Sequence, residues 1–253
     1  MTNILLCGAC GKMGHAVARA TDASGSARIV AGYDIKSMSD SSFPVYTSLA
    51  DVKEDIDVII DFSHPTLTEN VLAYCADKKI PAVICTTGLS SEQIAKINNL
   101  SASVPVFFSA NMSLGVNLLI DLAKRAAKLL EDNFDIEIIE KHHNQKIDAP
   151  SGTALAIADA ISDTVSYEPE YTYDRHSVRQ KRDRREIGIH ALRGGTIVGE
   201  HSIIFAGCDE VIELKHSATS KEVFAVGAIK AAVFLKDLTP GLYSMSDLIA
   251  SQQ

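Results

Sequence analysis

A short apolar run passes directly into three evenly spaced glycines in the stretch Asn3-Ile4-Leu5-Leu6-Cys7-Gly8-Ala9-Cys10-Gly11-Lys12-Met13-Gly14. The apolar run is typical of a buried strand, and the residues that follow, 12–23, have the pattern of a helix. Glycines at such a junction permit a tight turn that exposes the N–H groups of the helix start to a pyrophosphate. The spacing is one residue longer before the middle glycine than in the usual dinucleotide motif. Because strand, glycines and helix stand in the required order, we expect a dinucleotide-binding turn here.

The alternation of strand and helix continues through the first 110 or so residues. Helical patterns at 65–79 and 91–100 separate short apolar runs that are rich in β-branched and aromatic residues. Strands that are apolar throughout and separated by helices indicate a parallel sheet covered on both faces. The expected strands are residues 3–7, 28–33, 57–62, 81–85 and 104–108.

The pattern changes after residue 112. A helix is expected at 114–131, a strand at 135–140, a helix at 151–162 and a polar irregular segment at 163–185. Consecutive strand patterns then favour a more antiparallel sheet, and a final helix is expected to return to the first domain. We therefore predict an α/β fold: a Rossmann-type doubly wound parallel sheet from residues 1–112 and 219–253, and an α+β domain with a mixed or antiparallel sheet from residues 113–218. The late strands are 186–191, 196–205 and 210–215, and the last helix is 222–236.

The composition narrows the class of protein. The 253 residues carry a formal net charge of −8, which argues against nucleic acid or an anionic membrane as partner. No apolar run approaches the roughly 18–20 residues that span a bilayer. Five cysteines, an odd number, favour a reducing compartment over a disulfide framework, so we expect a cytoplasmic protein.

An acidic residue and two loops complete the expected nucleotide site. Asp34 stands 20 residues beyond Gly14, at the end of the second strand, where it can hold the ribose hydroxyls of a nicotinamide dinucleotide. Its charge repels a 2′-phosphate and favours NADH, whereas Lys12 and Lys36 can attract that phosphate, so NADH and NADPH both stay open. Polar loops follow the fourth and fifth strands, where ligands of such sheets bind: Thr86-Thr87-Gly88 and Ser109-Ala110-Asn111-Met112. On composition alone, an ordinary polar loop is the safer interpretation of each.

A second cluster of chemical groups lies in the segment 140–153, which holds two adjacent histidines, two lysines and the expected start of a helix. Histidine exchanges protons near neutral pH, while lysine and free N–H groups at a helix start hold anions. The segment therefore suits a small anionic molecule that must receive a proton. Taken singly, either histidine is more often an ordinary surface residue. No metal site is expected, because Cys7 and Cys10 lack a second cysteine pair and the histidines lack a third ligand.

The segment Glu140-Lys141-His142-His143-Asn144-Gln145-Lys146-Ile147-Asp148-Ala149-Pro150-Ser151-Gly152-Thr153 resembles the signature of the dihydrodipicolinate reductase family. The likeness extends over most of the chain in one order. It includes the glycine turn 8–14 and the stretches 61–63, 86–88, 110–117 and 187–201.

The resemblance implies an NAD(P)H-dependent reduction of dihydrodipicolinate, a cyclic imine with two carboxylates, in diaminopimelate and lysine synthesis. It implies that His142 and Lys146 are proton donors, and that His143, Gly152, Thr153 and Arg193 contact the substrate. It also implies a homotetramer assembled through the second domain, which would bind the substrate. The implied cofactor contacts are Gly8, Ala9, Cys10, Gly11, Lys12, Met13, Asp34, Cys85, Thr86, Thr87, Ser109, Ala110, Asn111 and Met112.

Three other interpretations stay open from the residues. The chain could be another Rossmann dehydrogenase of aspartate-family metabolism, or a non-catalytic NAD(H)-sensing protein. The basic stretch 175–185 could suggest nucleic acid, but the interspersed Asp174, Asp183 and Glu186 favour a solvated loop. His190 and His201 are expected to be structural polar residues.

Overall fold

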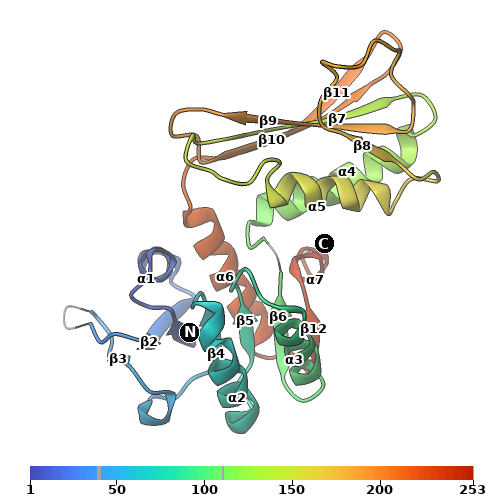
Figure 1. Ribbon diagram of the computed structural model, residues 1–253. Helices are drawn as coiled ribbons and strands as arrows, with labels where there is room; N and C mark the ends of the chain where they lie inside the picture. The colour runs from blue at the N-terminus through green and yellow to red at the C-terminus, as the bar shows by residue number, and fades with distance from the viewer. Residues whose placement is uncertain (39–40, 110, 253) are drawn as a thin grey trace. The chain divides into compact units, whose positions relative to one another are not determined.

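The computed structural model describes residues 1–38, 41–109 and 111–252. The chain forms two compact units, the first from Met1–Leu114 with Lys221–Gln253 and the second from Gly115–Ser220 (Figure 1). These boundaries lie two residues from the expected ones. No helix of the described residues is long and apolar enough to cross a membrane.

The first unit is built on a seven-stranded sheet in the order β12-β6-β5-β4-β1-β2-β3. All its strand pairs are parallel, so the predicted parallel sheet is confirmed. The short edge strands β3 and β12 were not expected from the sequence. The strands are β1 Thr2–Cys7, β2 Ala27–Tyr33, β3 Val45–Tyr46, β4 Val58–Asp61, β5 Ala82–Ile84, β6 Pro105–Phe108 and β12 Gly241–Tyr243.

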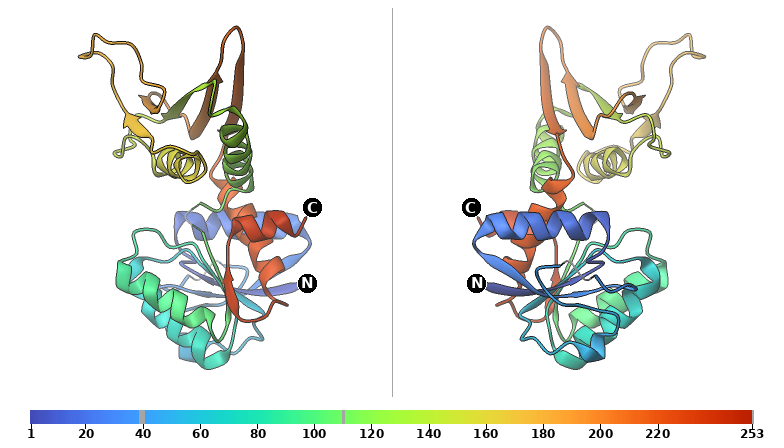
Figure 2. Two further views of the ribbon diagram at one scale, coloured as in Figure 1. Left: turned by 90° about the vertical axis from the view of Figure 1, so that its right-hand side faces the viewer. Right: turned by 90° about the vertical axis from the view of Figure 1, so that its left-hand side faces the viewer.

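Helices cover both faces of this sheet (Figure 2). In β1 the side chains alternate, so Ile4 packs into the core under α1, α6 and α7, and Leu5 packs into the core under α2 and α3. Both faces of the sheet are therefore buried, which explains the uninterrupted apolar runs. The helices are α1 Lys12–Ser24, α2 Thr68–Lys78, α3 Ser91–Ser101, α6 Glu222–Leu235 and α7 Met245–Ala250, with short 3-10 turns at η1 Leu49–Asp51 and η2 Pro65–Leu67.

The second unit is a five-stranded sheet in the order β11-β10-β7-β9-β8, with two helices packed on one face (Figure 2). The pairs of β10 are antiparallel and those of β9 are parallel, so the predicted mixed sheet is confirmed. In β7 every second residue is buried, from Ile136 to His142. The elements are α4 Leu114–Leu130, β7 Asp135–His142, α5 Gly152–Ser162, β8 Glu170–Thr172, β9 Glu186–Arg193, β10 Gly199–Ala206 and β11 Val211–Ala218.

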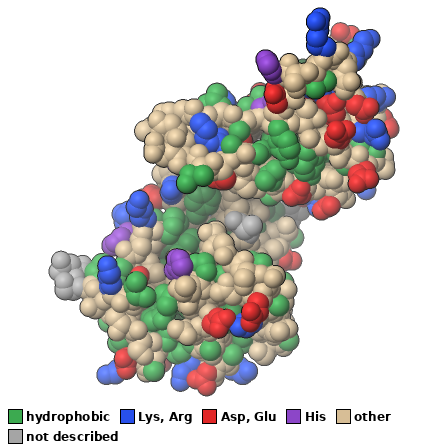
Figure 3. All heavy atoms as spheres, viewed as in Figure 1, with side chains coloured by type: hydrophobic (Ala, Val, Ile, Leu, Met, Phe, Trp, Pro, Cys, Tyr) green, Lys and Arg blue, Asp and Glu red, His purple; other side chains and the backbone are tan. Residues whose placement is uncertain are grey.

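The segment 163–185 is largely irregular and its residues 175–185 are mostly exposed, as expected, with two exceptions. It contains β8, and the guanidinium of Arg182 is largely buried, with the side chain 16% exposed. Arg182 donates hydrogen bonds to Oε1 of Glu137 and Oδ1 of Asp135, each over 2.9 Å. On the face shown in Figure 3, acidic and basic side chains intermingle over the second unit.

Candidate active site

The turn between β1 and α1 needs glycines because backbone atoms approach them closely. Gly8 has a φ of +78°, and a Cβ there would lie 2.6 Å from the carbonyl oxygen of Phe62. A Cβ on Gly14 would lie 2.3 Å from the carbonyl oxygen of Gly8. At Gly11 the nearest atom would be 3.2 Å away, which a small shift can relieve. Gly8 and Gly14 thus let the strand, the turn and the first helical turn pack without side chains.

The start of α1 is open to an anion. Its N-cap is Gly11, and no side chain of the described residues caps the helix there. The N–H groups of the first turn therefore keep their capacity to bind a phosphate. Beside them, the carboxylate of Asp34 accepts hydrogen bonds from the N–H of Cys10 over 2.9 Å and of Ile35 over 2.7 Å. The bond from Cys10 fastens the turn to the end of β2.

A cavity of about 410 Å³ in the first unit gathers the loops that follow β4, β5 and β6 with the start of α1. It contains eight of the expected cofactor contacts. Phe62, Ser63, Lys221 and Phe224 also line it, and the sequence did not assign them to the site. Ala110 lies outside the described residues. The eight expected contacts are Lys12, Met13, Cys85, Thr86, Thr87, Ser109, Asn111 and Met112.

The wall of this cavity holds unused hydrogen-bonding capacity. Ser63 Oγ is buried and has no partner among the described residues. Nearby, Thr86 donates to Asp61 Oδ2 over 3.0 Å, and burial raises the pKa of the fully buried Asp61 despite its hydrogen bonds. A buried hydroxyl without a partner is costly unless a ligand supplies one. The cavity, its hydroxyl and the uncapped α1 together fit a nicotinamide dinucleotide.

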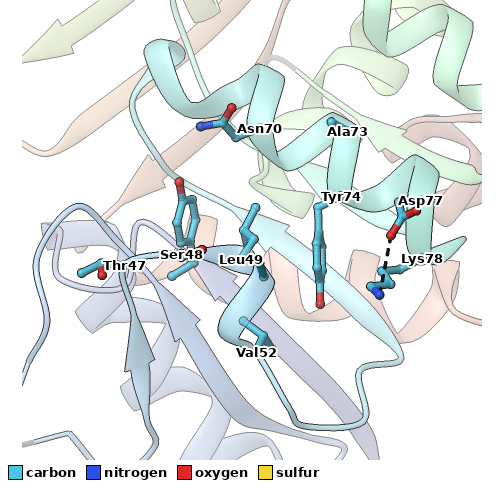
Figure 4. Close-up of a pocket in the computed structure, with 11 residues that line it drawn as sticks. Thr47, Ser48, Leu49, Val52, Asn70, Ala73, Tyr74, Asp77 and Lys78 are labelled. Atoms are coloured by element: carbon cyan, nitrogen blue, oxygen red, sulfur yellow. Dashed lines mark ion pairs between the residues drawn. The ribbon is translucent and has the colours of Figure 1, made fainter.

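A second cavity in the first unit, of about 580 Å³, lies between η1 and α2 (Figure 4). Tyr74 and Leu49 face each other across it, and its two charged side chains, Asp77 and Lys78, pair with each other over 3.6 Å. It contains none of the residues expected to bind cofactor or substrate. The cavity of about 410 Å³, which contains expected cofactor contacts, is therefore the better candidate for the nucleotide site, although it is the smaller of the two.

In the second unit, sheet register brings four polar side chains to one end of the sheet. Glu140 and His142 are two residues apart on β7 and therefore share a face. Arg193 on β9 pairs in register with His142, and His201 on β10 pairs in register with Glu140. The Nδ1 atom of His142 lies 2.6 Å from Oε2 of Glu140.

Glu140 is fully buried and has partners at both oxygens. Arg193 donates to Oε1 over 2.6 Å and to Oε2 over 2.8 Å, and the N–H of Ser151 donates to Oε1 over 2.9 Å. Burial opposes the charged carboxylate, but the hydrogen bonds from Arg193, His142 and Ser151 outweigh it and hold the pKa of Glu140 below its ordinary value. Glu140 is thus an anion at neutral pH.

Ser151 connects this cluster to α5. Its Oγ accepts from the N–H of Ala154 over 3.2 Å and so caps the helix, and it lies 3.1 Å from Nε2 of His201. The rings of His201 and His142 meet edge to face, with centroids 5.2 Å apart. Burial, followed by the neighbouring His142, lowers the pKa of His201 to about 4, so this imidazole is neutral near pH 7.

The other expected substrate contacts lie in the loop after β7 and at the start of α5. Lys146 pairs with Asp148 over 2.8 Å, and this bond holds the pKa of Asp148 below its ordinary value. His143 is half-buried, and Gly152 and Thr153 form the first turn of α5. Arg193 is engaged by Glu140 and also donates to the carbonyl oxygen of Asp148 over 2.6 Å.

The sequence did not single out Glu140, Ser151 or His201 for a role near His142. A signal for Glu140 was present, because a strand with Glu and His two residues apart places both on one face. Among the described residues, no group of three or more His, Cys, Asp or Glu side chains could hold a metal ion. The first unit thus has a cavity lined by expected cofactor contacts, and the second unit has an imidazole held by a carboxylate.

Comparison with known proteins accounts for both units. Residues 2–112 match the family described as dihydrodipicolinate reductase, N-terminus, and residues 115–249 match dihydrodipicolinate reductase, C-terminus. The 4-hydroxy-tetrahydrodipicolinate reductase of Caldanaerobacter subterraneus subsp. tengcongensis is 53% identical over 249 residues, which is 98% of each chain. That of Clostridium tetani is 48% identical over 251 residues, covering 99% of this chain and 98% of the relative.

Solved structures agree with the fold. The dipicolinate-bound dihydrodipicolinate reductase from Paenisporosarcina sp. TG-14 superposes with a TM-score of 0.81 at 25% identity, covering 96% of this chain and 97% of the other. A probable dehydrogenase from Thermotoga maritima, at 12% identity and a TM-score of 0.61, shares the fold alone. Because both halves match the same family and relatives at about half identity span nearly the whole length, the chain belongs to the dihydrodipicolinate reductase family.

Proposed function

We propose that this chain is a 4-hydroxy-tetrahydrodipicolinate reductase. It reduces dihydrodipicolinate, formed from 4-hydroxy-tetrahydrodipicolinate, to tetrahydrodipicolinate in the diaminopimelate and lysine pathway. NADH or NADPH supplies the hydride when bound. The family membership supports this reaction, and the observation that carries it on this chain is the buried His142, held at Nδ1 in the segment that leads into α5.

The first unit is the proposed cofactor domain. The glycine turn 8–14 and the open start of α1 would hold the pyrophosphate, and Asp34 the ribose hydroxyls. The cavity after β4, β5 and β6 would take the nicotinamide, with the Ser63 hydroxyl as a further donor. Its residues position the ring that gives up the hydride.

The second unit is the proposed substrate domain. Gly152 and Thr153, at the start of α5, would bind one carboxylate of the substrate at the N-terminus of this helix. Lys146 would balance the charge that develops on the ring nitrogen as the conjugated imine is reduced. His142 would then donate the proton, because its Nδ1 is occupied by Glu140 and its Nε2 is left for the substrate.

Turnover of freshly generated dihydrodipicolinate tests the proposed function. We expect consumption of NADH or NADPH that depends on this substrate, with tetrahydrodipicolinate as the product by mass spectrometry. Aspartate semialdehyde serves as the control substrate and should not be reduced. Absence of turnover with both cofactors, from a substrate batch that a Clostridium tetani homologue consumes, would contradict the proposal.

Assembly and location are part of the same proposal. We expect a homotetramer formed through the sheet of the second unit, where the edge strand β11 exposes Val211 and Ile212. Light scattering after size-exclusion chromatography should give about four times the chain mass of 27.2 kDa. All five cysteines are free, which supports a cytoplasmic location.

A further inference from the structure

We infer that Glu140 is a positioning residue for His142, and that Ser151 ties this pair to the substrate-carboxylate site at the start of α5. The inference rests on the proposed function, because it assigns a role in delivering the proton of that reaction. Glu140 does not touch the reacting atoms in this scheme. It acts by setting which nitrogen of His142 faces them.

The short bond between the two side chains determines the state of the imidazole. Oε2 of Glu140 lies 2.6 Å from Nδ1 of His142, and the carboxylate is ionised, so Nδ1 must donate. The proton that His142 gains and loses is therefore the one on Nε2. A Cβ on Gly199 would lie 3.1 Å from Nε2, so the glycine leaves this nitrogen the room that a side chain would take.

Three hydrogen bonds from two residues prevent the carboxylate from turning. Arg193 bonds to both oxygens, at 2.6 Å and 2.8 Å, and the N–H of Ser151 bonds to Oε1 over 2.9 Å. The guanidinium also offsets the charge of Glu140. The carboxylate can thus orient the ring of His142 without trapping the proton as an isolated buried anion would.

Ser151 connects Glu140 and His142 to the substrate-carboxylate site at the start of α5. Its N–H holds Glu140, while its side chain caps α5 by accepting from the N–H of Ala154 over 3.2 Å. Gly152 and Thr153 follow directly in the chain. A residue that sets the start of the helix therefore also sets the carboxylate behind His142, so the proton donor and the substrate anchor share one support.

The alternative is that Glu140 and Arg193 form a structural ion pair that has no effect on proton transfer. Strand β7 supplies a matched control for this alternative. Glu137 is also a carboxylate bonded to a histidine and an arginine, with Oε2 2.8 Å from Nε2 of His190 and Oε1 2.9 Å from Nε of Arg182. The two carboxylates are three residues apart in an alternating strand, so they point to opposite faces of the sheet.

The test compares Glu140→Gln with Glu137→Gln in the full-length protein. Steady-state kinetics gives kcat and KM for dihydrodipicolinate, and thermal melts report folding. Long-range ¹⁵N–¹H NMR spectra of the imidazoles report the tautomer, with the His142 signals assigned by their loss in His142→Gln. Wild-type turnover is measured first, so failure of the proposed function is recognised separately.

We expect kcat of Glu140→Gln to fall about 10²-fold, as for a catalytic group displaced by about an ångström, with KM within about threefold. Glu137→Gln should keep the wild-type kcat. Neutral His142 should carry its proton on Nδ1 in the wild type and should lose that preference in Glu140→Gln. An unchanged kcat in a folded Glu140→Gln protein, or an equal loss in Glu137→Gln, would overturn the inference. If Glu140→Gln fails to fold, the wild-type spectrum decides, and a proton on Nε2 would refute it.

Discussion

The N–H of Cys10 donates a hydrogen bond to Oδ2 of Asp34 over 2.9 Å, which joins the phosphate-binding turn to the acidic residue at the end of β2. Asp34 therefore has two functions in the proposed cofactor site. It fastens the turn, and it offers its carboxylate to the ribose hydroxyls. Different substitutions of Asp34 can therefore change its charge and its hydrogen-bonding capacity separately.

Asp34→Asn should shift the cofactor preference towards NADPH. The amide oxygen can still accept from Cys10, while loss of the negative charge removes the repulsion of a 2′-phosphate. We expect the ratio of kcat/KM for NADPH to that for NADH to rise about tenfold, which corresponds to about 1.4 kcal/mol. Asp34→Ala also removes the hydrogen-bond acceptor, so it should in addition weaken the binding of both NADH and NADPH. A ratio unchanged in Asp34→Asn would show that this carboxylate does not face the ribose.

His142→Gln should reduce kcat by about 10²–10⁴-fold, the usual effect of losing a proton donor. Lys146→Ala should reduce kcat by about 10²–10³-fold, because the charge that balances the ring nitrogen is lost. The assay is NADH or NADPH consumption with saturating dihydrodipicolinate. His190→Gln is the control, because its ring bonds to Glu137, outside the cluster of Glu140 and His142. A rate within about twofold of wild type would remove the substituted residue from its assigned role.

Much of the first unit could be predicted because its signals are local. The apolar runs, the glycines and the helix patterns each lie within about a dozen residues, and α3 begins with a capping box between Ser90 and Gln93. The edge strands β3 and β12 have two and three residues. Strands this short show no alternation, and only a neighbouring strand makes them part of a sheet.

The surroundings of His142 could not be predicted in the same way. Arg193 reaches Glu140 from 53 residues away through the parallel register of β7 and β9, and His201 arrives through the antiparallel register of β10. The register between strands that are distant in the chain cannot be read from local sequence patterns. The residues expected to act were therefore identified by their motif, while those that hold them became apparent only in the folded sheet.

Gly14→Ala should destabilise the first unit strongly. The new Cβ would stand 2.3 Å from the carbonyl oxygen of Gly8 and 2.5 Å from that of Ala9, and backbone atoms cannot move aside cheaply. We expect the free energy of unfolding to fall by about 3 kcal/mol in urea denaturation. Gly11→Ala, with its nearest atom at 3.2 Å, is the matched control and should lose less. Equal stabilities for the two variants would show that the turn relaxes freely.

The protein should become less stable as the pH falls through the range in which His201 is neutral only in the folded state. Burial, with the neighbouring His142, lowers its pKa from 6.5 to about 4. Between these values the unfolded chain binds a proton at this residue and the folded protein does not. Stability from this group is therefore complete above pH 6.5 and is lost as the pH falls towards 4, by up to about 3 kcal/mol.

His201→Gln isolates this contribution from the carboxylates that also titrate in acid. The free energy of unfolding of both proteins is measured by urea denaturation from pH 8 to pH 4.5. We expect parallel curves above about pH 7 and a steeper acid decline for the wild type, because only the wild type takes up the additional proton on unfolding. Curves that stay parallel down to pH 4.5 would mean that His201 titrates alike in both states, in contradiction to its burial and its contact with Ser151.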